Sequence, residues 1–153
     1  MKKILLVLVL TMMLVGCSKN EKLNLTNIKN KLETLEYNGE TIFSNNQYYD
    51  LDKLERKYEL DTSEIKDYIV SIHKNEASSN LYIIASYKKS KSKAKQELDK
   101  LIEAEKSSFS NGYFPKEYQK LENYYYKEYG NYLIYIVSDC NELVYEKIIE
   151  EKE

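Results

Sequence analysis

The chain has 153 residues, of which 42% are apolar and 31% are charged, with 23 Lys and Arg against 25 Asp and Glu. This length suits one domain, the charged fraction argues against a multi-span membrane protein, and a net charge of −2 argues against a nucleic-acid-binding protein, which is usually basic. One His, two Cys and four Gly leave too little material for a zinc site, a disulfide framework or a glycine-rich phosphate loop, so we expect neither a metal nor a cofactor.

The N-terminal residues have the pattern of an export signal. Lys2 and Lys3 precede an uncharged, mainly apolar run of twelve residues, from Ile4 to Val15. As a helix this run would extend about 18 Å, short of the ~30 Å hydrocarbon core of a membrane, and it has the length of the apolar region of a secretory signal. The run ends in Leu14-Val15-Gly16-Cys17, which resembles the lipobox of bacterial lipoproteins.

The lipobox resemblance implies a lipid anchor. The leader, residues 1–16, would be cleaved between Gly16 and Cys17, and the Cys17 thiol would carry a diacylglyceryl group. Two acyl chains hold a protein stably on a membrane, so we expect the chain on the extracytoplasmic face of the cell membrane. The alternative is an ordinary signal peptide, with Cys17 either a bystander or lost with the leader.

The sequence after the leader predicts a short tether and one folded domain. Residues 17–24 comprise the lipidated Cys17 and a polar tether, and residues 25–153 form a single domain without repeats or a Pro/Gly-rich linker. With Cys17 acylated, Cys140 is the only free thiol that remains. No internal disulfide can then form, so stability depends on a hydrophobic core.

Turn and capping residues divide the first half of the domain into short elements. Asp50 is placed to cap a helix that continues through Tyr58, and Asp61-Thr62-Ser63-Glu64 resembles the capping box of another helix. The remaining predictions for this half are a helix from Thr26, a turn at Asn38-Gly39, and strands over 68–72 and 81–87.

The second half of the domain predicts three helices and a hairpin. An amphipathic helix spans 92–107, Pro115 begins a short helix, and a last helix starts near Asn141. Two β-rich runs flank Gly130-Asn131, a two-residue loop typical of a β-hairpin. The predicted register pairs Tyr129 with Tyr132, Lys127 with Ile134 and Tyr125 with Ile136 on one face, and Glu128 with Leu133, Tyr126 with Tyr135 and Tyr124 with Val137 on the other.

Strand pairs separated by helices predict the α+β class. We expect a small antiparallel sheet with a C-terminal hairpin and helices packed mainly on one face. On that arrangement, the hairpin face with Tyr124, Tyr126 and Tyr135 is the core, and the opposite face is partly exposed.

Several features follow one another in a characteristic order. They are Tyr58-Glu59-Leu60-Asp61, the strand over 81–87, the amphipathic helix, Phe114-Pro115-Lys116-Glu117-Tyr118 and Gly130-Asn131-Tyr132-Leu133-Ile134. Their pattern resembles domain of unknown function 4358, a family of small Gram-positive lipoproteins, over Leu25 to Glu146. Glu59 stands where this family often has Gly, and Phe114 stands where it usually has Tyr. The resemblance supports the α+β architecture and implies no particular activity.

Cys140 and His73 are the candidates for catalytic chemistry. Cys140 precedes a predicted helix, where backbone N–H groups can make a thiol nucleophilic, but it shares an apolar stripe with Val144 and Ile148, which favours a buried, inert thiol. His73 is the only His, and its position predicts an exposed strand end. No hydrolase, metalloprotease or phosphate-loop motif is present, so we assign no catalytic residue.

A run of lysines is a candidate contact for an anionic surface. Five lysines fall within eight residues at the end of a strand and the start of a helix: Lys88, Lys89, Lys91, Lys93 and Lys95. Each can add about 1 kcal/mol to binding near an anionic membrane. The alternative, which we favour, is a solvated loop whose lysines protect a strand end from edge pairing.

Tyrosine is unusually common, with 16 Tyr against three Phe and no Trp. A surface of tyrosines can stack on sugar rings or hold a peptide, because the side chain is amphipathic and loses little entropy when it is ordered. The candidate binding face of the hairpin consists of Tyr125, Tyr129, Tyr132 and Lys127. The alternative is that Tyr replaces Phe as core filler.

Together these features predict a lipid-anchored envelope protein that is a non-catalytic binding module. Its expected partners are the membrane, through the N-terminal lipid, and a cell-wall component or another envelope protein, with no nucleic acid. The alternative class is an envelope-acting enzyme with an unrecognised active site, because paired carboxylates are recognised by a geometry that sequence does not show.

Overall fold

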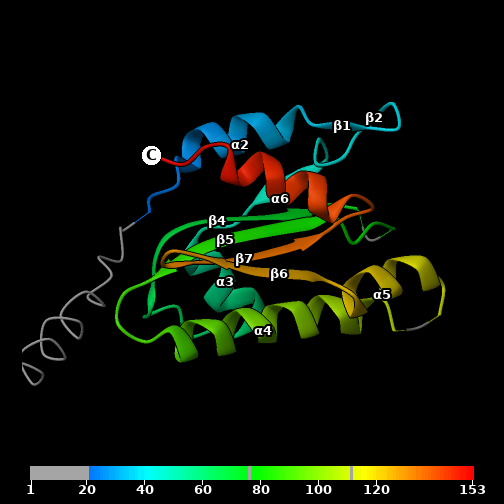
Figure 1. The fold of residues 1–153 in the computed structure, drawn as a ribbon. Helices are drawn as coiled ribbons and strands as arrows, with labels where there is room; N and C mark the ends of the chain where they lie inside the picture. Colours follow the sequence, from blue (N-terminus) through cyan, green and yellow to red (C-terminus); the bar gives the residue numbers. More distant parts are fainter. Residues whose placement is uncertain (1–20, 76, 111) are drawn as a thin grey trace, which may run out of the picture.

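Five antiparallel strands form the central sheet of the computed structural model, which describes residues 21–75, 77–110 and 112–153 (Figure 1). Their order across the sheet is β3-β4-β5-β7-β6. The strands are β3 (Asn46–Tyr48), β4 (Ile65–His73), β5 (Leu81–Tyr87), β6 (Tyr125–Tyr129) and β7 (Tyr132–Val137). A separate two-stranded hairpin, β1 (Glu36–Tyr37) and β2 (Glu40–Thr41), turns at Asn38-Gly39 as predicted. The α+β class, the antiparallel sheet and the C-terminal hairpin are confirmed.

Helices cover both faces of the sheet (Figure 1). One face packs against α3 (Leu51–Tyr58), α4 (Lys91–Ser108) and α5 (Pro115–Glu122), and the other packs against α2 (Leu25–Glu33) and α6 (Asn141–Ile149). Three of the described helices lie on one face, but α2 and α6 cover the opposite face, which was expected to be partly exposed. Every residue of β7 is buried, because successive side chains point to opposite faces and both faces are apolar.

The hairpin has the register that the sequence predicts. Tyr129 pairs with Tyr132, and the ladder continues to the pair of Tyr125 and Ile136. Strand β6 begins at Tyr125, so the predicted pair of Tyr124 and Val137 falls outside the ladder. Gly130 has a φ of +53°, the left-handed conformation that this two-residue turn requires.

Capping residues account for most of the helix starts. The Asp50 carboxylate accepts the Lys53 N–H at 2.7 Å, as predicted, and Ser90 caps α4. At α2 the cap is Asn24, which accepts the Asn27 N–H at 3.0 Å, so the helix starts before Thr26. The left-handed φ of +54° at Glu59, just after α3, explains why a Gly would suit this position.

The predicted capping box at residues 61–64 starts no helix. Glu64 instead reaches across to the start of α4, where its carboxylate accepts the N–H groups of Lys89 at 2.9 Å and Ser90 at 2.8 Å. These backbone hydrogen bonds hold the pKa of the Glu64 carboxyl below its usual range. Glu64 therefore stabilises the N-terminus of a helix that begins 27 positions later, at Lys91.

The folded domain begins earlier than the predicted boundary at residue 25. Leu23 is buried and forms a β-bridge with Lys152, and the Asn24 N–H donates to the Glu151 carbonyl oxygen at 2.9 Å. These contacts join the two ends of the domain and shorten the tether that residues 17–24 were expected to form. None of the described helices has both the length and the apolar character needed to cross a bilayer.

Candidate functional site

The candidate site lies at the end of the sheet where β4 stops and β5 starts. Residues 74–80 connect these strands, and a hollow lies on either side of the connection. We name the first the Cys140 pocket, lined by Tyr37, Asn38, Glu40, Ile42, Asn80, Asp139 and Cys140. We name the second the α3–α4 groove, lined by Gln47, Lys57, Tyr58, His73, Lys74, Asn75, Ser78, Ala104, Glu105, Ser108 and Phe109.

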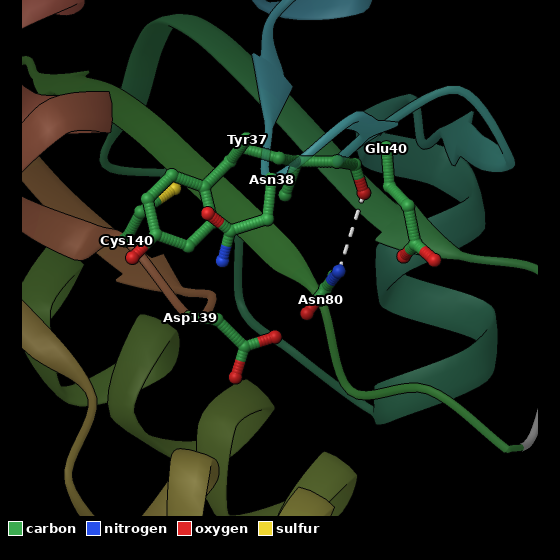
Figure 2. Close-up of a pocket in the computed structure, with 7 residues that line it drawn as sticks. Tyr37, Asn38, Glu40, Asn80, Asp139 and Cys140 are labelled. Carbon is green, nitrogen blue, oxygen red and sulfur yellow. Dashed lines mark hydrogen bonds between the residues drawn. The ribbon is translucent and has the colours of Figure 1, made fainter.

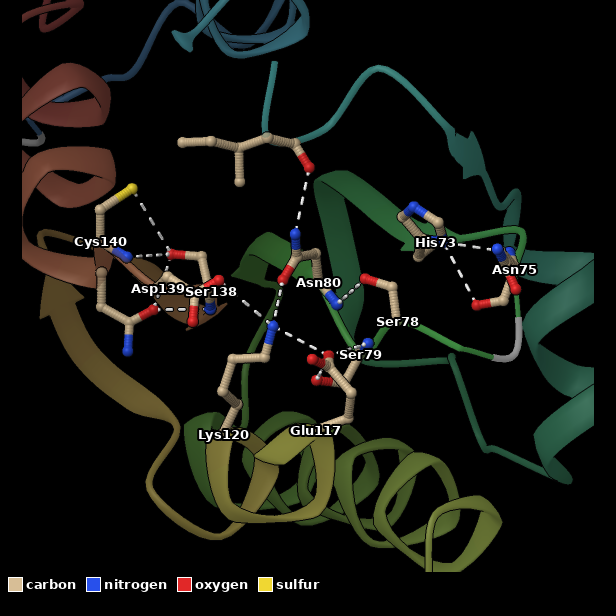
Figure 3. Close-up of polar contacts among 12 residues, drawn as sticks. His73, Asn75, Ser78, Ser79, Asn80, Glu117, Lys120, Ser138, Asp139 and Cys140 are labelled. Carbon is tan, nitrogen blue, oxygen red and sulfur yellow. Dashed lines mark hydrogen bonds and ion pairs between the residues drawn. The ribbon is translucent and has the colours of Figure 1, made fainter. Parts of the chain in front are cut away.

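A polar network around Asn80 fixes this end of the sheet (Figure 3). The side-chain amide of Asn80 makes both contacts: its Nδ2 donates to the Ile42 backbone carbonyl at 3.2 Å, and its Oδ1 accepts from Lys120 Nζ at 2.9 Å. Lys120 also pairs with Glu117 at 2.8 Å and with Asp139 at 3.5 Å. Lys120 therefore joins α5 to the start of β5 and to the turn between β7 and α6.

Glu117 is the anionic centre of this network. Its Oε2 accepts hydrogen bonds from the Ser79 N–H at 2.7 Å and from the Ser79 hydroxyl at 2.8 Å. Burial works to raise the pKa of the Glu117 carboxyl, but the hydrogen bonds from Lys120 and Ser79 outweigh it and hold the pKa below its usual range. The carboxylate is therefore charged at neutral pH, and it holds Ser79 in place just before β5.

The Cys140 pocket is small and has acidic walls (Figure 2). Its volume is about 160 Å³, and the carboxylates of Glu40 and Asp139 line it together with the Asn80 amide. Burial raises the pKa of the Cys140 thiol, and the hydrogen bond from the Ser138 hydroxyl only partly offsets this. The thiol is therefore protonated at neutral pH and poorly suited to nucleophilic attack.

The α3–α4 groove is larger, with a volume of about 510 Å³, and is mostly polar. Lys57 Nζ donates to the hydroxyls of Tyr58 at 2.7 Å and Tyr49 at 3.1 Å. Burial and then the charge of Glu105 raise the pKa of the Tyr58 phenol, so Tyr58 stays protonated and donates to Glu105 at 2.5 Å. A fixed ammonium group and a carboxylate already engaged by hydrogen bonds thus lie side by side in this groove.

The structure does not bring Cys140 and His73 together. Cys140 lines the pocket and His73 lines the groove, and Figure 3 shows them on opposite sides of Asn80. His73 is half-buried, and its Nδ1 accepts the Asn75 N–H at 3.0 Å. No three His, Cys, Asp or Glu side chains of residues 21–75, 77–110 and 112–153 are grouped so that they would hold a metal ion.

The predicted tyrosine face of the hairpin is largely covered. Tyr132 is 5% exposed, which contradicts the expectation that it stays partly open. Tyr125 and Tyr129 are half-buried, and Tyr125 packs against Tyr145 of α6 with a ring separation of 5.7 Å. Lys127 is exposed, with its Nζ 5.0 Å from the centre of the Tyr125 ring. Because α6 and α2 occupy this side of the sheet, most of the tyrosine surface serves the core.

The lysine run lies at the opposite end of the sheet from the two hollows, because β5 begins beside the hollows and ends just before Lys88. Lys91 pairs with Glu128 at 2.9 Å, and Lys95 pairs with Asp99 at 2.7 Å. Lys88 donates to the Ser63 carbonyl at 2.8 Å, while Lys89 and Lys93 are exposed. Acidic partners therefore offset part of the charge of this run, and its contact with an anionic surface stays a prediction.

Apart from Cys140 and His73, the residues that line the two hollows were not predicted. These residues come from separate stretches of the chain, so no local sequence motif predicts that they line the same hollow. The one available signal is the stretch from Lys74 to Asn80, which is polar and lies between two apolar strands. Gly16 and Cys17, the predicted cleavage and lipidation site, lie outside the described residues.

The fold and this site define a small α+β domain with a sheet covered on both faces and two polar hollows at one sheet end. The family model described as Domain of unknown function (DUF4358) matches residues 40–138, more than half of the chain, and the chain belongs to this family. The matched range runs from β2 to the end of β7 and includes Asn80, Lys120 and the whole groove. No curated protein and no solved structure matches the chain.

Proposed function

We propose that this protein is anchored by a lipid at Cys17 on the extracytoplasmic face of the cell membrane and that its domain binds a component of the cell envelope. The observation that carries the proposal is the motif Leu14-Val15-Gly16-Cys17 at the end of an apolar run too short to span a membrane. A binding role rather than catalysis is supported by the protonated thiol of Cys140 and its separation from His73.

The position of Glu21, where the described domain begins, supports an orientation of the domain relative to the membrane. Glu21 lies against the turn of the β6–β7 hairpin, since a Cβ on Gly130 would come within 3.0 Å of the Glu21 carbonyl oxygen. The α3–α4 groove lies at the other end of the sheet. Strand β4 has nine residues and runs from the Glu21 end to the groove end, so the two are about 27 Å apart.

The tether restricts how far the domain can move from the membrane. Only three residues, 18–20, lie between Cys17 and Glu21, and the four Cα–Cα steps between these two residues reach at most about 14 Å. The end of the sheet beside Glu21 is therefore the membrane-proximal end in this proposal. The Cys140 pocket and the α3–α4 groove then face away from the anchoring membrane, toward the envelope.

Metabolic labelling with an alkyne-bearing fatty acid tests the anchor. The wild-type chain is expected to incorporate the label, and Cys17→Ala is expected to lose it completely, because the diacylglyceryl group forms a thioether with this thiol. Cys140→Ala is the matched control, since it removes the other Cys of the chain and should leave labelling unchanged. Label retained by Cys17→Ala, or absent from the wild type, would show that the protein is not anchored in this way.

A further inference from the structure

We propose that the α3–α4 groove binds a phosphate-bearing ligand. The proposal deepens the function above by naming the ligand class of the groove, and it relies on that function only for the side of the membrane on which the ligand is met. With a volume of about 510 Å³, the groove falls within the range of small-molecule sites, about 300–1,000 Å³.

Lys57 provides a positioned cation on the α3 side of the groove. The hydroxyls of Tyr49 and Tyr58 both accept from its Nζ, which also lies 4.6 Å from the centre of the Tyr58 ring. Glu105 is 3.8 Å from this ammonium group and already accepts the Tyr58 hydroxyl at 2.5 Å. Because the ammonium group is held in place before a ligand arrives, little side-chain entropy is lost when an anion binds.

Lys74 and His73 supply the opposite side of the groove. Lys74 is exposed, and no carboxylate within the described parts of the chain pairs with its ammonium group. His73 Nδ1 lies 3.0 Å from the Asn75 backbone nitrogen, whose N–H it accepts in one tautomer, and 3.2 Å from the Asn75 carbonyl oxygen, to which it donates in the other. Nε2 has no partner among the described residues, and in the first tautomer it can donate to a ligand.

Hydrogen bonds at the end of α4 reduce its repulsion of an anion. The last carbonyls of α4 would repel one, but the Ser108 hydroxyl donates to the Glu105 carbonyl at 2.6 Å and the Phe109 N–H donates to the Lys106 carbonyl at 3.1 Å. Among the described lining residues there are therefore two ammonium groups, those of Lys57 and Lys74, and one carboxylate, that of Glu105. Lysine binds phosphate as a point charge, and a phosphate group presents oxygens in several directions, so the ammonium groups from α3 and from the end of β4 can each contact a different oxygen.

Titration of the full-length lipidated protein in non-ionic detergent micelles tests the groove. The probes are inorganic phosphate, glycerol 3-phosphate and the diester glycerophosphoglycerol, followed by amide chemical shifts at low salt. We expect saturable binding with a Kd of about 1 mM or tighter, with the largest shifts at residues 73–75 and 108–109. Tighter binding of the diester would assign the groove to a phosphodiester polymer, and tighter binding of phosphate or the monoester would assign it to a small phosphorylated solute.

Charge-removing variants locate the binding. Lys74→Gln and Lys57→Gln are each expected to weaken binding about five- to tenfold, the usual effect of losing one charge-assisted contact. Lys74 is exposed, so its variant should fold even if Lys57→Gln does not. Lys89→Gln is the matched control, because it removes an exposed charge at the other end of the sheet and should change the Kd less than about twofold.

Three results would overturn the phosphate assignment. They are the absence of saturation by all three probes, equally tight binding of acetate, and a loss in Lys89→Gln as large as that in Lys74→Gln. None of these results affects the fatty-acid labelling of Cys17, so failure of the groove assignment and failure of the anchor are distinguished.

Discussion

Tyr135→Ala is expected to lower the free energy of unfolding by about 3–5 kcal/mol, the usual cost of deleting a large buried aromatic side chain. Tyr135 is completely buried in β7, with its ring 4.9 Å from that of Tyr126 and 5.8 Å from that of Tyr124. Truncation would leave a cavity between the sheet and α4, because the surrounding helices cannot close over it fully. Denaturant unfolding followed by circular dichroism measures this change.

The Tyr135 hydroxyl allows packing to be separated from hydrogen bonding. It donates to Asp99 at 2.9 Å, and Asp99 keeps Lys95 as a second partner. Tyr135→Phe keeps the ring and removes only this hydrogen bond, so its expected cost is about 1–1.5 kcal/mol. If the Ala and Phe variants lost equal stability, the packing of this ring would not be what stabilises the sheet.

Lys120→Met is expected to cost about 2–4 kcal/mol of folding stability, because it removes a charged donor from partly buried acceptors. The side chains of Lys120 and Glu117 are 15% and 17% exposed, and Met preserves most of the apolar stem of Lys120. The variant removes the hydrogen bond of 2.9 Å to the side-chain oxygen of Asn80, and it leaves the Glu117 carboxylate with Ser79 as its remaining hydrogen-bond donor. Lys116→Met is the matched control, since Lys116 is exposed on the same helix and should change stability by less than about 0.5 kcal/mol.

The pH dependence of the Lys120→Met effect tests whether Lys120 acts through its ion pair with Glu117. Because the pKa of Glu117 is lowered in the folded protein, its ion pair stabilises the fold above the unfolded-state pKa and is lost as the pH falls through the lower folded-state value. The stability difference between wild type and Lys120→Met should therefore be full at pH 7 and shrink in acid. A difference that stays constant down to pH 3 would show that Glu117 is not the principal partner.

Local patterns in the sequence were sufficient for most individual elements. The strand over 81–87 and the hairpin register were predicted correctly, because apolar alternation and a Gly130-Asn131 turn are short-range signals. The Asp50 cap was likewise predicted from one residue and its spacing. The capping box at 61–64 failed because Glu64 finds its partners at the start of α4, a contact that only the tertiary fold creates.

The helices on the second face of the sheet were not predicted, because one face of the hairpin was assigned to the core and the other to a partly exposed surface. Leu133 and Ile134 are neighbours on opposite faces of β7, and both are buried. An uninterrupted apolar strand is typical of a sheet covered on both sides, so the information was present in the sequence. Its consequence is that Tyr132, taken as part of a binding face, belongs to the core.

The α3–α4 groove could not be predicted from the sequence. Lys57 and Glu105 are 48 positions apart, and His73 comes from a third element. Each of these residues alone is typical of a solvent-exposed surface. Only the packing of α3 and α4 against the end of β4 brings them into one hollow.

The central claim is that a lipid anchors the membrane-proximal end of the sheet and that the groove faces away from the membrane. Energy transfer from a single fluorophore to an acceptor lipid tests it in vesicles that carry the lipidated protein. In a Cys140→Ser background, fluorophores attached at Asn131→Cys and at Ala77→Cys mark the two ends of the sheet, and both positions are exposed. Transfer is expected to be much stronger from position 131, since the two ends are about 27 Å apart. Equal transfer from both positions, or stronger transfer from position 77, would contradict the claim.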